Sequence, residues 1–450
     1  MSGNTISAPT DEKNLRDFCY NTGMKQFASL VLLLVLSCGA AERRLPLAEY
    51  REKMAAGWLG QMVGVAVGYP TEFKFNGPIV PQSKLARLCG PEGWVMPSVN
   101  EAYGQDDLYV EMTFLRTLEQ YGLDVGICQA GIDFANSAYP LWCANDAGRK
   151  NLRKGIAPPD SSHPAFTSRC NDIDYQIEAD FSGLISPGLP QRAIKLGETF
   201  GRLMNYGDGL YAGQFVGALY AGAFFATNRV ELVREALRAI PAESQYAAMV
   251  RDTLARYETF ARGGQGLKAG EAAWEFAQRQ AVRLYFDKST SVLKDSNGGI
   301  DARLNGAMVL IGFLYGEGDP AKTIEIATRC GFDSDCNPST AAGILFTMLG
   351  QRRLDRKWGM MLEQGPRFHS TPYTFQALVN VCLKLAEQVV VAEGGRVDCD
   401  PFGNEVFVIP VQEPRPSAFH PSWDPDQPTG RRFSAEEQAK ILFMENGKRK

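Results

Sequence analysis

The sequence predicts an all-α protein: one compact multi-helix domain followed by an extended, proline-rich C-terminal segment. Apolar residues recur at helical spacing in successive segments between about residues 47 and 393. Loops rich in Gly, Pro, Asn and Asp separate these segments. Alternating strand patterns are scarce, and the best of them covers 406–411.

The bulk composition is that of an ordinary globular chain. Its 450 residues, 45% of them hydrophobic, are enough for one large domain or two smaller ones. A formal net charge of −4 argues against a nucleic-acid partner, which would require a basic face. The three histidines are widely separated and no CxxC pair occurs, so we expect oxygen ligands for any metal.

The N-terminus resembles an export signal. A polar extension, 1–23, precedes Met24, which is a candidate for the true start. Within 24–40 a lysine, a short apolar run and a small-residue junction follow one another. The run is shorter than the roughly 20 residues that span a bilayer. The junction at Cys38 resembles a bacterial lipoprotein signal. A plain cleaved signal and a buried apolar helix are the alternatives. We therefore expect an exported protein, periplasmic or anchored through a lipid on Cys38.

The helical domain is expected over 45–398. Many of its segments carry Ala and Gly on one face, which lets helices approach closely. The expected helices are 57–68, 108–121, 215–226, 230–239, 246–261, 270–285, 307–315, 321–330, 339–349 and 376–391.

The C-terminal segment, 399–450, has a different character. Seven prolines fall between Pro401 and Pro428, which predicts an extended segment lying on the domain surface. Ser434 and Glu437 have the spacing of a capping box, so a last short helix is expected there.

The strongest local motif is Cys-Gly-Phe-Asp-Ser-Asp-Cys-Asn-Pro at 330–338. Asn337 is a good N-cap and Pro338 a good first residue for the helix that follows. The two carboxylates, Asp333 and Asp335, are held on a short turn and could bind a hard cation such as Mg²⁺. The alternative is that they only cap the helix.

Two weaker motifs precede it. Asp106 and Asp107 lie at the start of a helix, where the helix dipole alone would favour carboxylates. A helix with glycines at 57, 60, 64 and 68 is suited to close packing and leads into a loop that carries Glu72.

Together, and in this order, the three motifs resemble the ADP-ribosylglycohydrolase family, which includes the dinitrogenase-reductase-activating glycohydrolases. The family pattern runs from a Gly-rich helix with a Glu-Phe end, through Thr-Asp-Asp-Thr, to Gly-Gly-Asp-Thr-Asp-Thr-Asn. The matching stretches here are 64–73, 105–108 and 331–337. The resemblance extends over about residues 50–350.

The resemblance implies an all-α fold with two Mg²⁺ ions in a cleft, Mn²⁺ being a possible substitute. It implies that Asp106, Asp107, Asp333 and Asp335 are metal ligands and that Glu72 handles a proton. The implied reaction is hydrolysis at the anomeric carbon of a ribose.

Departures from the family pattern leave questions open. The last threonine of the closing motif is Cys336, a poor magnesium ligand, so its position could pass to water, to Ser334, or be lost.

The middle of the chain lacks the family's usual loop and is dense in carboxylates instead. Its weaker candidates for substrate contacts are Asn171, Asp174, Glu178 and Asp208.

Two functions remain. The first is an exported Mg²⁺-dependent hydrolase of an N- or O-glycosidic bond. Because ADP-ribosylated proteins are mainly intracellular, a nucleoside-like molecule or another furanoside becomes an expected substrate. The second is a catalytically silent sugar- or nucleotide-binding protein on the same fold.

Overall fold

The computed structural model describes residues 41–85, 89–90, 93–94, 99–260, 267, 270–354, 358 and 362–443. The chain from Arg43 onward forms one compact unit. The polar extension and the signal expected over 1–40 lie outside the described residues.

Helices dominate the described residues, which confirms the predicted all-α class. The α-helices are α2 (Leu47–Gly68), α3 (Asp106–Tyr121), α4 (Ile127–Ala135), α5 (Cys143–Arg153), α6 (Asp174–Ile177), α7 (Asp180–Leu184), α8 (Pro190–Phe200), α9 (Asp208–Ala223), α10 (Arg229–Leu237), α11 (Gln245–Phe260), α12 (Ala273–Tyr285), α13 (Ala302–Tyr315), α14 (Pro320–Arg329), α15 (Cys336–Leu349), α16 (Phe375–Ala392) and α17 (Ala435–Ala439). The strands are β1 (Glu42–Pro46), β2 (Cys89–Gly90), β3 (Gly93–Trp94), β4 (Arg396–Cys399) and β5 (Glu405–Pro410). Each helix expected from the sequence lies on an observed one.

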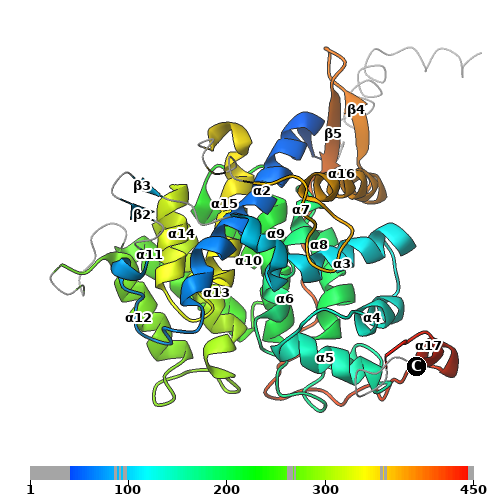
Figure 1. The fold of residues 1–450 in the computed structure, drawn as a ribbon, viewed down its shortest axis with the longest axis horizontal. Helices are drawn as coiled ribbons and strands as arrows, with labels where there is room; N and C mark the ends of the chain where they lie inside the picture. The colour runs from blue at the N-terminus through cyan, green and yellow to red at the C-terminus, as the bar shows by residue number, and fades with distance from the viewer. Residues whose placement is uncertain are drawn as a thin grey trace, which may run out of the picture. The chain divides into compact units, whose positions relative to one another are not determined.

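Four helices, α2, α9, α13 and α15, form the centre of the unit. Every residue of α13 is buried, as are nearly all residues of α9 and α15. Their sequences are apolar all round, which is typical of helices enclosed by other helices. α2 lies alongside α15, and α9 and α13 also contact α15 (Figure 1). Outer helices pack onto this centre, α8 and α10 on α9, and α11 and α12 on α13.

The contact between α2 and α15 depends on glycine. A Cβ added at Gly68 would lie 1.8 Å from the Ser334 carbonyl oxygen. A Cβ at Gly64 would lie 2.3 Å from the Pro338 carbonyl oxygen. Side chains cannot occupy either space, so the backbones touch directly. The close packing predicted from the glycines of 57–68 is therefore confirmed.

A small sheet lies at the end of the helical unit. Its strand order is β1-β5-β4, and β4 pairs antiparallel with β5, from Arg396 opposite Val408 to Cys399 opposite Glu405. The middle strand β5 is the segment whose alternation was noted in the sequence. α16 packs against both β4 and β5 (Figure 1).

Among the described helices, α16 is the one long and apolar enough to cross a membrane. It packs against α2, α3 and the sheet, with residues such as Leu378, Cys382 and Val389 fully buried. These contacts are those of a core helix.

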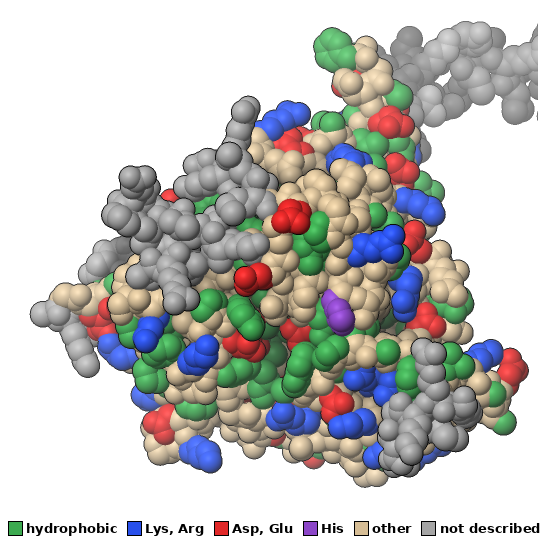
Figure 2. Space-filling model, in the orientation of Figure 1, with side chains coloured by type: hydrophobic (Ala, Val, Ile, Leu, Met, Phe, Trp, Pro, Cys, Tyr) green, Lys and Arg blue, Asp and Glu red, His purple; other side chains and the backbone are tan. Residues whose placement is uncertain are grey.

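The C-terminal segment begins after β5. Residues 411–431 form neither helix nor strand, as the prolines predict. The predicted capping box is present at α17: the Glu437 N–H donates to Ser434 Oγ, and the Ser434 N–H donates to Glu437 Oε2. On the face shown in Figure 2, acidic and basic side chains of the described residues are interspersed.

Candidate functional site

Two loops form one wall of the candidate site. The loop after α2 carries Glu72, and the loop between α14 and α15 carries Asp333. The Phe73 N–H donates to the Phe332 carbonyl oxygen at 2.8 Å, and the Phe332 N–H donates to the Phe75 carbonyl oxygen at 3.0 Å. This backbone pairing brings Glu72 beside Asp333, although the two residues are far apart in the sequence.

Unusual backbone conformations accompany the pairing. Phe73 has φ 48° and Phe332 has φ 61°, a region that bulky residues seldom adopt. Gly331 has φ 78°, and a Cβ there would lie 2.3 Å from the Phe75 carbonyl oxygen. The surrounding fold must therefore hold these loops in place, as it commonly does at functional sites.

The start of α15 differs from the sequence prediction. We expected Asn337 as the N-cap, but α15 begins at Cys336 and its N-cap is Asp335. Asn337 is buried, and its side-chain amide donates to Asn305 Oδ1 on α13 at 3.0 Å, so it is not available as a cap. The Asp335 side chain makes no capping hydrogen bond. Its carboxylate therefore does not cap the helix, and its Oδ1 has no hydrogen-bond partner among the described residues.

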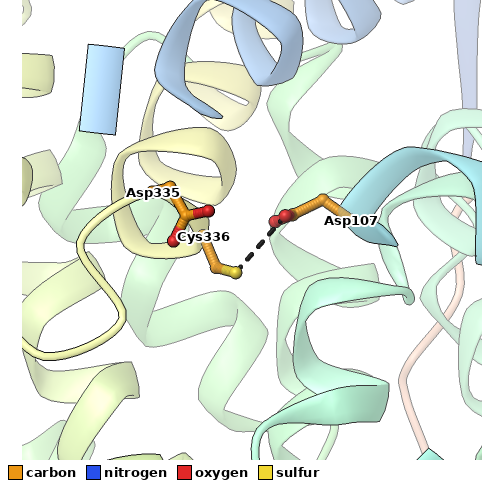
Figure 3. A group of neighbouring side chains, drawn as sticks. All are labelled: Asp107, Asp335 and Cys336. Carbon is orange, nitrogen blue, oxygen red and sulfur yellow. Dashed lines mark hydrogen bonds between the residues drawn. The ribbon is translucent and has the colours of Figure 1, made fainter. Parts of the chain in front are cut away.

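The opposite wall is the first turn of α3. Asp106 is half-buried, and Asp107 is 1% exposed. The Cys336 thiol donates a hydrogen bond to Asp107 Oδ2 at 3.3 Å. Figure 3 shows Asp107 on α3 directed toward Cys336 and Asp335 at the start of α15.

The possible ligand atoms fall into two overlapping groups. Asp107, Asp335 and Cys336 form one, and Glu72, Asp333 and Asp335 form the other; within each group the atoms lie within 4.8 Å of one another. Asp335 belongs to both.

The grouping bears on the roles predicted for Asp106 and Glu72. Asp106 stands outside both groups but is close enough for its charge to raise the pKa of Glu72. Glu72, expected as a proton-transfer group, lies within ligand distance of Asp333 and Asp335.

The electrostatics of the cluster are those of crowded buried acids. Burial raises the pKa of Asp333 to about 7, and the nearby charges of Asp107 and Glu72 act in the same direction. Burial, followed by the charge of Asp333, raises the pKa of Asp335 well above its ordinary value. Burial, followed by the charge of Asp335, does the same to the pKa of Asp107. The charges of neighbouring carboxylates thus make ionisation harder, whereas hydrogen bonds with Asp335 and Cys336 lower the pKa of Asp333.

These residues fit a divalent cation. Asp107, Asp333 and Asp335 each keep one Oδ1 atom with no hydrogen-bond partner among the described residues, and each is at most 3% exposed. Buried, unpaired carboxylate oxygens are costly. A hard cation bound by several such oxygens would remove that cost.

Two of the four weaker candidates lie next to this cluster. Asp174 accepts hydrogen bonds from the backbone N–H groups of Ala144, at 3.1 Å, and Asn145, at 2.9 Å. Burial raises the pKa of Asp174 to about 7, with a smaller contribution from Asp106. Glu178 is fully buried, accepts from the Asn145 amide and keeps Oε2 unpartnered among the described residues.

The other two belong to a different polar network. Asn171 donates to Asp295 Oδ2 at 2.7 Å. Asp208 accepts from the Tyr246 N–H at 2.8 Å and forms an ion pair with Arg303 at 3.4 Å. Asp208 therefore belongs to the polar network around α9 and α13, and Asn171 keeps its buried Oδ1 without a partner among the described residues.

A buried acidic pair, Glu111 and Asp180, lies next to the cluster. Glu111 accepts from the Phe181 N–H at 2.7 Å, and Asp180 accepts from the Tyr220 hydroxyl at 2.8 Å. Burial, then the charge of Asp180, raises the pKa of Glu111. The four-residue spacing from Asp107 to Glu111 puts both on one helix face, as the sequence alone indicates.

The fold and the buried acidic centre define a helical protein suited to binding divalent cations. The family model for ADP-ribosylglycohydrolase matches residues 46–394. The chain belongs to the ADP-ribosylglycohydrolase family, whose members are in general metal-dependent glycohydrolases.

One solved chain, described as "ADP-ribosylglycohydrolase-related protein complex", is 17% identical, with a TM-score of 0.44. That match covers 76% of this chain and 99% of the other. A comparison with curated proteins finds no match.

Proposed function

We propose that this protein is an exported, divalent-metal-dependent hydrolase of an N- or O-glycosidic bond at the anomeric carbon of ribose or a related furanose. The observation that carries the proposal is the convergence of buried and half-buried carboxylates from α3, the loop after α2, and the loop that leads into α15. In the described part of the chain, none of these five carboxylates, Glu72, Asp106, Asp107, Asp333 and Asp335, forms an ion pair with a Lys, Arg or His side chain.

The four aspartates would hold the cations. The family resemblance implies two Mg²⁺ ions, with Mn²⁺ as a possible substitute. When bound, a divalent cation supplies charge stabilisation to the oxygens of the reacting centre. The buried aspartates would fix its place, because Asp107 and Asp335 lie at helix starts packed in the core and Asp333 lies in the loop just before α15.

Glu72 is suited to proton transfer. It is half-buried at the rim of the cluster, so a substrate can approach it from solvent. Burial, followed by the charge of Asp106, raises the pKa of Glu72 above its ordinary value. A carboxyl group with a raised pKa holds a proton more readily, which suits it to exchange one with water or a leaving oxygen.

The proposed substrate is a small molecule or glycan that contains a furanose. Asp174 and Glu178, on the side of Asp106, are the residues we expect to contact its hydroxyl groups. Export and a lipid anchor on Cys38 belong to the proposal and rest on the N-terminal sequence. Mass spectrometry of the secreted or membrane fraction tests them.

Metal binding by calorimetry is the primary test. Mg²⁺, Mn²⁺ and Ca²⁺ are titrated into the wild-type chain and into the double variant Asp333→Asn with Asp335→Asn. We expect saturable binding that the double variant loses, followed by hydrolysis in a screen of ribosides and furanosides.

Two results would contradict the proposal. The absence of binding at millimolar metal would remove its basis and favour the silent sugar- or nucleotide-binding protein. Efficient cleavage of ADP-ribosylated protein, with no furanoside cleaved, would refute the substrate class.

A further inference from the structure

Cys336 differs from an ordinary core cysteine. It is 5% exposed and lies outside the main hydrophobic core, in a small cluster with Ile173 and Ile177. Its sulfur donates to Asp107 and lies near the carboxylate of Asp335 (Figure 3). Cys336 therefore contacts apolar side chains and possible metal ligands at once.

Ser334 does not replace the sulfur. Its Oγ is 2.8 Å from Thr71 Oγ1 and donates to the Gly68 carbonyl oxygen at 3.5 Å, and the residue is fully buried. These contacts direct the hydroxyl to α2, away from Asp107. The thiol of Cys336 and the carboxylate of Asp335 are thus the side-chain groups of this turn that lie near Asp107.

The two ligand groups are chemically unlike. Glu72, Asp333 and Asp335 offer oxygen alone, whereas Asp107, Asp335 and Cys336 combine oxygen with sulfur. In the mixed group, the Oδ1 atoms of Asp107 and Asp335 are buried and without a partner among the described residues. These unpartnered oxygens indicate a cation independently of the thiol.

From this geometry we infer that the cluster has two unlike cation positions, and that Cys336 supplies sulfur to one of them, shared with Asp107 and Asp335. That position takes a borderline metal such as Zn²⁺ or Co²⁺ in preference to Mg²⁺. Thiolate is a soft ligand that favours such ions, whereas Mg²⁺ requires oxygen and near-octahedral geometry. As the sulfur–metal bond forms, the S–H bond breaks and its proton leaves to solvent.

The inference rests on the proposed function, because it requires that the carboxylate cluster binds divalent cations. It goes further in assigning a metal class to one half of the cluster. The all-oxygen half keeps the hard cation that the family resemblance implies.

Cobalt absorption spectroscopy tests the inference without an activity assay. The wild-type chain, Cys336→Thr and the control Cys330→Ala are titrated with Co²⁺. Cys330 is a matched control because it is fully buried, lies in the same loop region and stands outside both ligand groups. We expect a sulfur-to-cobalt charge-transfer band in wild type and Cys330→Ala, and its loss in Cys336→Thr.

Calorimetry gives a second readout. We expect the ratio of Zn²⁺ to Mg²⁺ affinity to fall on the order of 10- to 100-fold in Cys336→Thr. Changing a residue that only supports a metal ligand commonly weakens metal binding by this factor, and loss of a ligand should cost no less. Cys336→Ser, smaller and unbranched, serves if the threonine variant does not fold.

The outcomes separate the two proposals. Cobalt binding without the band in wild type, together with an unchanged affinity ratio in the variant, would overturn the role of Cys336 and leave the metal-dependent hydrolase intact. If no divalent cation binds at all, both proposals fail.

Discussion

Asp335 connects the two halves of the acidic cluster. Its carboxylate lies within ligand distance of Glu72 and Asp333 on one side and of Asp107 and Cys336 on the other. A shared carboxylate of this kind can bridge two cations, and it accumulates repulsion when none is bound. This repulsion should therefore lower the stability of the folded protein when no metal is bound.

The pKa of Asp333, raised by burial from 3.8 to about 7, gives that cost a pH dependence. The folded state holds this proton more tightly than the unfolded state. Its contribution to stability is therefore complete below about pH 4 and is lost as the pH rises through about 7. In the presence of a chelator that removes metal, we expect the melting temperature of the protein to fall by several degrees from about pH 5.5 to about pH 8. Added metal at the higher pH should restore it.

The same experiment on Asp333→Asn with Asp335→Asn is the control. Because the amides do not ionise, we expect a flatter pH profile, a higher melting temperature than wild type in chelator at about pH 8, and no response to metal. A wild-type profile in this variant would show that the two carboxylates do not cause the pH dependence.

Glu72→Gln separates proton transfer from metal binding. If Glu72 acts as the acid or base, kcat should fall by about 10²- to 10⁴-fold while the metal affinity stays near wild type. Calorimetry and steady-state kinetics on the same preparation measure both. Loss of metal binding in this variant would instead make Glu72 a ligand, as its distance to Asp333 and Asp335 permits.

At the scale of elements, the packing of α2 on α15 positions the site. A Cβ at Gly68 would lie 1.8 Å from the Ser334 carbonyl oxygen and 2.5 Å from the Asp335 Cα. Both neighbours are backbone, so they cannot move aside without shifting the loop that carries the carboxylates. The glycine that allows the helices to touch therefore also sets the place of Asp335.

Gly68→Ala should consequently affect stability and metal affinity together. We expect a loss of about 1–3 kcal/mol in unfolding free energy, as for other overpacked sites, and weaker metal binding. Gly365→Ala is the control, since its site is open and exposed, and its effect should stay within about 0.5 kcal/mol. Urea melts and calorimetry measure the two effects. Normal metal affinity in Gly68→Ala would contradict the positioning role.

The helices differ in how well the sequence alone predicts them. Long apolar helices such as α13 and α15 were predictable because their composition alone indicates burial. The short helices α6 and α7 were not, because buried acids interrupt the apolar pattern of this region: Asp174 in α6, Asp180 in α7 and Glu178 between them all lie at most 5% exposed. Hydrophobic periodicity cannot identify helices whose interior face is charged.

The site, like the fold, was predictable only where a local sequence pattern marked it. Local motifs marked Asp106, Asp107, Asp333 and Asp335 because each pair sits at a helix start. The approach of Cys336 to Asp107 depends on how α15 meets α3, which no local pattern records.

At the scale of the whole molecule, the C-terminal segment lies beyond the family match, which ends at residue 394, yet it is tied to the helical unit. The anchor is Asp160, which is 1% exposed. Its carboxylate accepts hydrogen bonds from the backbone N–H groups of Thr429 at 2.9 Å, Gly430 at 2.8 Å and Arg431 at 3.1 Å. Prolines predicted an extended segment, but this anchor comes from a tertiary contact.

Asp160→Asn should release the segment. An amide cannot accept through both of its atoms, so at least one charge-assisted bond is lost, at about 1.5–3 kcal/mol. Trypsin should then cleave faster at the exposed Arg431 and Arg432, which limited proteolysis with mass spectrometry would detect. Asp426→Asn is the matched control: its side chain is 73% exposed, and its pair with His420 contributes little in solvent. Equal cleavage rates in wild type and Asp160→Asn would mean that other contacts hold the segment, and that Asp160 does not anchor it.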